Sequence, residues 1–310
     1  MSLERALELA ERGRGTTHPN PVVGAVLVRD GKVVGEGWHE RRGGPHAEIV
    51  ALEAAGERAR GATLYVSLEP CAHHGTTPPC VDAVLAAGVA KVVAGSVDPN
   101  PEAGGGLERL HAAGLEVKLA DSFAARQQNE AWRRWAAERR PFVTYKIAVT
   151  SDGRVTLPGS RWISGEESRH LVHELRAASD AVAVGMGTVR ADNPRLDARD
   201  VRVARQPRRL AFGRGPLPEG SGLELVDGPL DEALARLARE GVQSLLLEGG
   251  PTLAAAFLAA GLVDKLLLFV APARAGAGVV APLPDPAGLA RLSVRRVGED
   301  ALLTAYVHAP

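Results

Sequence analysis

Three side chains that commonly bind zinc occur at a suggestive spacing in the first third of the sequence. His46 and Glu48 stand two residues apart at the start of a predicted helix, and Cys71 and Cys80, the chain's two cysteines, follow. One imidazole and two thiolates hold zinc and leave a fourth position for water. Zinc makes that water acidic, and a carboxylate beside the metal can carry its proton. The pattern predicts a hydrolytic zinc site, with His46, Cys71 and Cys80 as ligands and Glu48 as the proton carrier.

The H-A-E triplet alone is weak evidence, because such a triplet is usually only an ordinary first turn of a helix. Both cysteines follow in the required order, however, and Cys71 stands directly after Pro70 at the end of a predicted strand. Two thiols in a cytoplasmic chain are more often metal ligands or spectators than a structural disulfide. A histidine, a carboxylate two residues later and then two cysteines form the signature of zinc-dependent base deaminases.

A second pattern, near the end of the chain, could bind a phosphate. Residues 245–252 (LLLEGGPT) read as an apolar strand, a glycine turn and a helix start. Backbone N–H groups at such a helix start can approach a phosphate closely. The same glycines could serve only to supply positive φ angles, and the turn does not match the dinucleotide fingerprint G-x-G-x-x-G.

The elements that must position these residues alternate between strands and helices, which indicates an α/β fold in layered domains. The first part has an expected hairpin around Asp30-Gly31, helices over 2–13, 46–59, 81–89 and 107–113, and strands over 62–70, 90–97 and 115–119. The second part has expected strands over 142–149, 180–185, 207–212, 242–247 and 264–271, helices over 166–178, 230–240 and 251–260, and a closing β-hairpin. The rest of 186–226 is rich in Pro, Gly and Arg and is expected to form loops.

The two parts are expected to be separate domains of different fold. The sequence predicts an Arg-rich helix over 122–140. This helix should end before Pro141, because a proline disfavours helical backbone at the residue before it. We therefore expect a deaminase domain over 1–121, a connecting helix over 122–140 and a second domain over 141–310.

Composition excludes several classes of protein. Hydrophobic residues make up 45% and charged residues 24% of the 310 residues, as in globular chains with a sizeable core. The 37 basic and 37 acidic side chains balance, so the electrostatic footprint of a nucleic-acid binder is missing. The sequence has no apolar run long enough to span a membrane and no apolar signal segment at its start. We expect a cytoplasmic protein without nucleic-acid or membrane partners.

Four stretches of the first part resemble the deaminase half of bifunctional riboflavin biosynthesis proteins: 17–24 (THPNPVVG), 46–48 (HAE), 70–80 (PCAHHGTTPPC) and 98–101 (DPNP). The wide gap between the cysteines separates this family from cytidine and tRNA adenosine deaminases. The resemblance implies the same zinc ligands, Glu48 as proton shuttle and Asn20 as a contact to the pyrimidine. His39 and His73 could line that pocket or be solvated. The turn at 102–106 departs from the family by one missing residue and a missing basic side chain.

The second part resembles the reductase half of the same family at 146–154 (KIAVTSDGR), 159–164 (GSRWIS), 187–194 (GTVRADNP) and 248–252 (EGGPT). The resemblance implies a dihydrofolate-reductase-like fold after a cytidine-deaminase-like three-layer domain, with NADPH as cofactor. Implied cofactor contacts are Val149, Trp162, Thr188, Asp192, Gly250, Pro251 and Thr252. Implied substrate contacts are Ser160, Arg176, Leu196, Arg199 and Glu248. The match weakens over 205–227, which leaves NADH use open. Arg208, Arg209 or Arg214 could meet the 2′-phosphate of NADPH.

The resemblance implies one Zn²⁺ per chain and two consecutive reactions on a small pyrimidine ribosyl phosphate. The first would remove the 2-amino group of 2,5-diamino-6-ribosylamino-4(3H)-pyrimidinone 5′-phosphate, and the second would reduce the ribosyl group to ribityl with NADPH. The resemblance also implies a homodimer or tetramer, joined through the reductase sheets. Two alternatives stay open: a deaminase that acts on a nucleic-acid base, and a monofunctional deaminase whose reductase domain has decayed.

Overall fold

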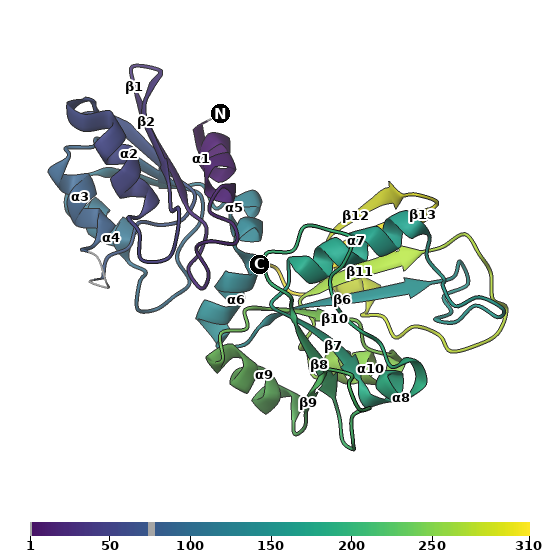
Figure 1. Ribbon diagram of the computed structural model, residues 1–310. Coiled ribbons are helices and arrows are strands. Elements are labelled where there is room, and N and C mark those ends of the chain that lie inside the picture. The colour runs from purple at the N-terminus through teal and green to yellow at the C-terminus, as the bar shows by residue number, and fades with distance from the viewer. Residues whose placement is uncertain (1, 74–77) are drawn as a thin grey trace. The chain divides into compact units, whose positions relative to one another are not determined.

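The structure is a computed structural model that describes residues 2–73 and 78–310. Contacts between residues divide the chain into two compact units, Met1–Glu138 with Pro310, and Arg139–Ala309 (Figure 1). Each unit has its own sheet and its own hydrophobic core, which confirms the expected α/β class.

The first unit is built on a five-stranded sheet with the strand order β2-β1-β3-β4-β5. Its strands are β1 (Gly24–Arg29), β2 (Lys32–Trp38), β3 (Thr63–Val66), β4 (Lys91–Ala94) and β5 (Glu116–Leu119). Its helices are α1 (Ser2–Glu11), α2 (Ala47–Ala55), α3 (Cys80–Ala86), α4 (Gly106–Ala112), α5 (Phe123–Gln128) and α6 (Glu130–Glu138), with a short 3-10 turn at Gly56–Ala59. The hairpin β1–β2 turns at Asp30-Gly31, as the sequence predicts.

Helices cover both faces of this sheet, so the unit has the three layers that the resemblance implies (Figure 1). Small and branched side chains of α2, α3 and α4 pack on one face, among them Ala51, Val84 and Leu110. Ala6 and Leu9 of α1 pack against Val26 on the other face. Burial of these apolar side chains stabilises each helix on the sheet more than helix propensity does.

Two glycines of β2 let helix α2 approach the sheet very closely. A Cβ added at Gly35 would stand 2.3 Å from the carbonyl oxygen of Ala51, and one added at Gly37 would stand 2.5 Å from the Ala51 nitrogen. Backbone therefore packs on backbone, and no larger residue fits at either position. This contact fixes the place of the first turn of α2, where His46 and Glu48 are found.

Residues 122–140 differ from the single connecting helix that we expected, because they form the two helices α5 and α6, which cluster with the first unit. Asn129 stands between them and is buried. Its side-chain oxygen accepts from the nitrogen of Val22 at 3.0 Å, and its amide nitrogen donates to the carbonyl of Val22 at 2.8 Å. This pair of tertiary hydrogen bonds fixes the break, and a propensity pattern does not reveal it.

The second unit is built on an eight-stranded sheet with the order β12-β13-β11-β6-β10-β7-β8-β9. Its strands are β6 (Phe142–Val149), β7 (Ala181–Gly185), β8 (Arg208–Phe212), β9 (Glu224–Val226), β10 (Ser244–Leu247), β11 (Lys265–Val270), β12 (Ala290–Val297) and β13 (Asp300–Tyr306). Its helices are α7 (Glu166–Ala177), α8 (Met186–Asp192), α9 (Leu230–Arg239) and α10 (Pro251–Ala259), with a 3-10 turn at Pro286–Gly288. The expected closing hairpin is confirmed as β12–β13.

The helices of this unit lie on opposite faces of the sheet. Side chains of α9 and α10, such as Leu234 and Phe257, pack on the face that carries Val143 and Tyr145. Val172 of α7 and Val189 of α8 lie in clusters on the other face. The chain thus leaves the adjacent parallel strands β7 and β10 toward opposite faces, which opens a crevice at their carboxyl ends.

Residues 186–226 contain more regular structure than expected, since α8 and β9 occur there beside β8. Helix α8 follows β7 without a break, and three-residue β9 adds to β8 in parallel. Both are short, so sequence periodicity does not reveal them. Among the described residues no helix is both long and apolar enough to cross a membrane.

Candidate active sites

The structure brings the three predicted zinc ligands together in the first unit. His46 is the extended residue before α2, Cys71 lies in the segment after β3, and Cys80 is the first residue of α3. The His46 Nδ1 atom lies 3.1 Å from the Cys80 sulfur and 3.6 Å from the Cys71 sulfur. All three ligand atoms lie within 4.8 Å of one another.

This donor set fits zinc. Ligand bonds of about 2.0–2.3 Å in a tetrahedral site separate the ligand atoms by about 3.3–3.8 Å, close to the two distances measured from His46 Nδ1. Hydrogen bonding with the Cys80 thiol, and then with His46, lowers the pKa of the Cys71 thiol. The backbone N–H of Cys80 also donates to the Cys71 sulfur at 3.3 Å. The protein therefore stabilises a thiolate at Cys71, which is the form that binds a metal.

Glu48 lies in the first turn of α2, beside the ligand cluster. The residue is 3% exposed, and its carboxyl group hydrogen-bonds the Cys80 side chain. Burial raises the pKa of Glu48 to about 7. A carboxyl group whose pKa lies near neutral both accepts and returns a proton efficiently, so the position and the pKa suit a proton carrier.

Asn20 also reaches this site, through His39. The Asn20 amide nitrogen lies 3.3 Å from Nε2 of His39, and Nδ1 of His39 lies 3.0 Å from the carbonyl of Pro45. Since the carbonyl can only accept, Nδ1 carries the proton and Nε2 accepts from Asn20. The His39 ring stands edge-on to His46 at a centroid distance of 5.5 Å. This buried histidine therefore contacts Asn20 through one ring nitrogen and the zinc ligand His46 through the ring edge. His73 is exposed, and residues 74–77 of the same motif lie outside the described residues.

Glu69, whose role was not predicted from the sequence, stabilises the segment that carries Cys71. Its two carboxylate oxygens accept from the nitrogens of Leu107, at 2.9 Å, and Asp98, at 3.0 Å. A Cβ added at Gly106 would stand 1.7 Å from the carbonyl oxygen of Pro70. The shortened turn at 102–106 therefore packs on the backbone before Cys71 and holds it in place. The position of this carboxylate at the end of a buried strand is the feature of the sequence that could have revealed the role of Glu69.

In the second unit the expected phosphate turn lies at the crevice between β10 and β7. Gly250 caps helix α10, and a Cβ added at Gly250 would stand 2.8 Å from the Thr188 hydroxyl of α8. A side chain at Gly250 would thus fill the space where the two helix starts face each other. The backbone N–H groups at the start of α10 and the Thr188 hydroxyl form a cradle. This pyrophosphate cradle fits the diphosphate group of a dinucleotide.

Glu248 lies one residue before this turn, in a cluster of charges. Arg176 of α7 pairs with it through two parallel hydrogen bonds, Nε to Oε1 at 2.6 Å and the second nitrogen to Oε2 at 3.0 Å. Lys146 of β6 lies 3.5 Å from the same carboxylate. Burial opposes the charged form, but the two cations outweigh burial and hold the pKa of Glu248 below its ordinary value. Lys146 was not assigned a role from the sequence.

Arg176 links this cluster to the loop after α8, since it also donates to the carbonyl of Asp197 at 3.1 Å. The Asp197 carboxylate pairs with exposed Arg199 at 2.8 Å, and the backbone N–H of Arg199 donates to His173 at 3.4 Å. Leu196 is buried and has a φ of 54°. Of the predicted substrate contacts, Arg176, Leu196, Arg199 and Glu248 thus gather in one place.

The other predicted residues of this unit are spread along the carboxyl edge of the sheet and the loop after β6. Val149 ends β6 and is buried, whereas Asp192 ends α8 and is exposed. The hydroxyl of Ser160 donates to the carbonyl of Trp162 at 2.7 Å, and Trp162 is 51% exposed. In the part of the chain that the structure describes, no hydrogen bond or ion pair joins Ser160 or Trp162 to the Glu248 cluster.

Comparison with known proteins finds a family match for each of the two units. Residues 2–96 match the family described as the cytidine and deoxycytidylate deaminase zinc-binding region. Residues 141–303 match the RibD C-terminal domain, which is more than half of the chain. The chain belongs to the RibD family of riboflavin biosynthesis proteins. It carries both the deaminase and the reductase domain of that family.

The similarity to RibD proteins extends over nearly the whole chain. The riboflavin biosynthesis protein RibD of Aquifex aeolicus is 38% identical and aligns over 97% of this chain and 96% of that relative. The structure of Acinetobacter baumannii RibD matches with a TM-score of 0.81 at 36% identity, covering 98% and 97%. A Thermotoga maritima structure, a diaminohydroxyphosphoribosylaminopyrimidine deaminase/5-amino-6-(5-phosphoribosylamino)uracil reductase, matches with a TM-score of 0.80 at 33% identity, covering 98% and 97%.

These matches confirm the fold expected of each RibD domain, cytidine-deaminase-like in the first and dihydrofolate-reductase-like in the second. The cofactors of the chain are zinc for the deaminase and NADPH for the reductase. Both groups fit the residues described above.

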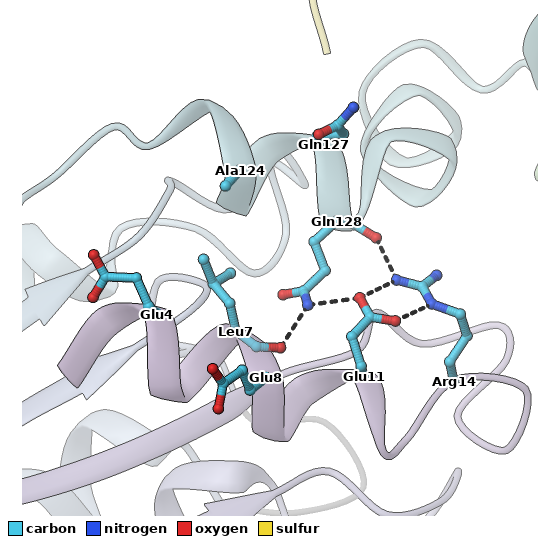
Figure 2. Close-up of a pocket in the computed structure, with 8 residues that line it drawn as sticks. All are labelled: Glu4, Leu7, Glu8, Glu11, Arg14, Ala124, Gln127 and Gln128. Atoms are coloured by element: carbon cyan, nitrogen blue, oxygen red, sulfur yellow. Dashed lines mark hydrogen bonds and ion pairs between the residues drawn. The ribbon is translucent and has the colours of Figure 1, made fainter. Parts of the chain in front are cut away.

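A separate hollow of about 520 Å³ lies between α1 and α5, away from the zinc ligands (Figure 2). Gln128 donates to the carbonyl of Leu7 at 2.8 Å and to Glu11 at 2.7 Å, and Arg14 pairs with Glu11. These bonds tie α5 to α1. Glu4, Glu8, Ala124 and Gln127 complete the lining, which holds no residue of the deaminase site.

Proposed function

We propose that the first domain hydrolyses the exocyclic 2-amino group of 2,5-diamino-6-ribosylamino-4(3H)-pyrimidinone 5′-phosphate, releasing ammonia. The second domain then reduces the ribosyl group of the deaminated product to ribityl, giving 5-amino-6-ribitylamino-2,4-pyrimidinedione 5′-phosphate. The observation that carries the proposal is the ligand cluster with buried Glu48 beside it, in one chain with the reductase crevice. The Thermotoga maritima relative is described as having the same pair of activities.

In the deaminase, His46, Cys71 and Cys80 would hold zinc, which supplies an acidified water when bound. Glu48 would take one proton from this water and pass it to the ring nitrogen, and would then carry the second proton of the same water to the leaving amine, which departs as ammonia. Its burial keeps the carboxyl group out of bulk water, and its pKa of about 7 lets it work in both directions. Asn20, oriented by His39, would hold the pyrimidine edge.

In the reductase, the turn Gly250 to Thr252 and Thr188 would hold the pyrophosphate of NADPH, which supplies a hydride when bound. Val149, Trp162 and Asp192 would complete the cofactor site. Arg176 and Arg199 would hold the substrate, because a guanidinium pairs with phosphate oxygens in a bidentate manner. Ser160, Leu196 and Glu248 would form the rest of the substrate site, with Glu248 keeping Arg176 in place.

The assignment is tested by a Cys71→Ser variant, with zinc content, ammonia release and NADPH oxidation as separate readouts. We expect the variant to lose zinc and deamination but to reduce the already deaminated intermediate at the wild-type rate. Retention of zinc and of ammonia release in the variant would show that the cluster is not the deaminase site.

We also propose that the chain is a homodimer or a dimer-based tetramer joined through the reductase sheet. Strand β12 forms one edge of that sheet, and its side chains Leu292 and Val294 are 60% and 62% exposed. An edge strand with apolar side chains is a pairing surface, and an antiparallel pair of such edges satisfies a two-fold axis.

We further propose 1–121 as the deaminase domain and 141–310 as the reductase domain, with the helices of 122–140 between them. A cytoplasmic location is proposed from the two cysteines, which are free thiols arranged as metal ligands and need a reducing compartment.

A further inference from the structure

The three arginines around β8 lie at opposite ends of that strand. Arg208 and Arg209 are its first two residues, whereas Arg214 follows its last residue, Phe212. Strand β8 runs parallel to β7, with Phe212 opposite Gly185. Arg214 therefore lies at the carboxyl edge, where the cofactor crevice opens, and Arg208 and Arg209 lie at the other edge.

The two arginines at the far edge already have partners there. Arg208 pairs with Glu224 and Glu240, both at 2.7 Å. Arg209 donates to the carbonyl of Arg195 at 3.2 Å. Neither of them is positioned to meet a cofactor at the β10–β7 crevice.

Helix α8 connects the pyrophosphate cradle to Arg214. On one side its Thr188 hydroxyl faces Gly250, 2.8 Å from an added Cβ. On the other side its Met186 side chain lies against the turn after β8, 3.1 Å from a Cβ added at Gly213. The turns after β10 and β8 are thus separated by two strand spacings, about 10 Å. That distance is comparable with the span from a pyrophosphate across one ribose to its 2′ position.

The turn that carries Arg214 is itself held in place. Arg190 of α8 donates to the carbonyl of Arg214 at 2.8 Å. The guanidinium of Arg214 is held only at the surface, by Asp227 at 3.0 Å, and its side chain is 84% exposed. A fixed backbone and an exposed charged side chain make Arg214 available to a ligand at this edge.

We propose that Arg214 is the residue by which the reductase domain selects NADPH over NADH, by pairing with the 2′-phosphate. Arg190 is a positioning residue, because it fixes the turn. Asp227 works in the opposite direction: its carboxylate competes for the guanidinium and repels a phosphate, while it tolerates the 2′-hydroxyl of NADH. The inference rests on the cofactor crevice described under the proposed function.

The test measures dissociation constants of NADPH and NADH by calorimetry in the absence of substrate, so no turnover is needed. The full-length zinc-loaded protein is compared with Arg214→Ala, Asp227→Asn and, as a matched control at the far end of the same strand, Arg208→Ala. We expect Arg214→Ala to weaken NADPH binding by about tenfold to a hundredfold, the value of one or two charge-assisted hydrogen bonds, and to leave NADH binding within about twofold. Asp227→Asn should tighten NADPH binding and leave NADH binding unchanged, and Arg208→Ala should change neither.

A variant Arg214→Ala that still prefers NADPH as strongly as the wild type does would overturn the proposal. If Arg214→Ala weakens the binding of both dinucleotides equally, the Arg214→Lys variant decides between a damaged fold and a wrong proposal. Arg214→Lys should restore the preference for NADPH, and failure to restore it would also overturn the proposal. A wild-type protein that binds neither dinucleotide would contradict the cofactor crevice itself and the reductase assignment with it.

Discussion

Glu48 combines nearly complete burial, a place beside the ligand cluster and a pKa near neutral. Replacing it by Gln keeps the size and removes the proton carrier. We expect Glu48→Gln to lower the deamination rate by at least about a hundredfold while zinc stays bound. The measurements are ammonia release and zinc content. Glu53→Gln, an exposed position on the same helix, is the control that should behave as wild type. A Glu48→Gln protein that deaminates at the wild-type rate would exclude this mechanism.

The same carboxyl group makes the zinc-free protein sensitive to pH. Its pKa rises from 4.5 to about 7 on folding, so the folded state binds more protons than the unfolded state between these values. The stability that Glu48 contributes is fully present below about pH 4.5 and is lost as the pH rises through about 7, which amounts to about 3 kcal/mol. Urea unfolding of chelator-treated protein at about pH 5 and about pH 8 measures this loss. Because the unfolded carboxyl group is already largely ionised at about pH 5, Glu48→Gln should show a loss that is smaller by about 2.5 kcal/mol between these two pH values. An equal loss in both proteins would refute the explanation.

At this scale the sequence revealed the residues that form a motif. His46, Cys71, Cys80 and Glu48 were predicted from type and spacing, and the structure places them together. Glu69, Lys146 and Asp197 were missed because they act through contacts with residues far away in the chain, such as Glu69 with Leu107. Only the folded chain shows such contacts.

Among the elements, the start of α10 has a direct test. Gly250 has a φ of −62°, which any residue can adopt, so an effect of Gly250→Ala must come from space alone. The added Cβ would stand 2.8 Å from the Thr188 hydroxyl and would fill the pyrophosphate cradle. We expect NADPH binding to weaken by about tenfold or more. Gly187→Ala is the control on the neighbouring helix, because nothing lies within 4 Å of its added Cβ. If Gly250→Ala binds NADPH as tightly as the control variant Gly187→Ala does, the cofactor binds elsewhere.

The long periodic elements of the fold were predictable, and the short ones were not. Strand β6 and helices α7 and α10 lie within a residue or two of their expected ranges. Helix α8 and strand β9 were missed because each is short and is stabilised by packing on β7 and β8 rather than by a pattern of its own. The break at Asn129 depends on its buried hydrogen bonds to Val22, which lie more than a hundred residues away in sequence.

For the whole molecule, the exposed side chains of Leu292 and Val294 on the edge strand β12 predict self-association. Replacing Leu292 and Val294 together by Asp should convert the assembly to monomers, because it places two charges on the proposed pairing surface. Light scattering coupled to gel filtration measures the mass. Val33→Asp, an exposed apolar position in the deaminase domain, is the control. A double variant with the wild-type mass would show that the chain associates through another surface, and a monomeric wild type would contradict the proposal.

The central claim is that one chain carries both activities. The most direct measurement is mass spectrometry of the diaminopyrimidine ribosyl phosphate after incubation with the zinc-loaded protein, with and without NADPH. Two active domains predict loss of the amino group without NADPH and a gain of two hydrogens only when NADPH is added. An unchanged substrate would contradict the account. So would a product that is deaminated but is not reduced when NADPH or NADH is added.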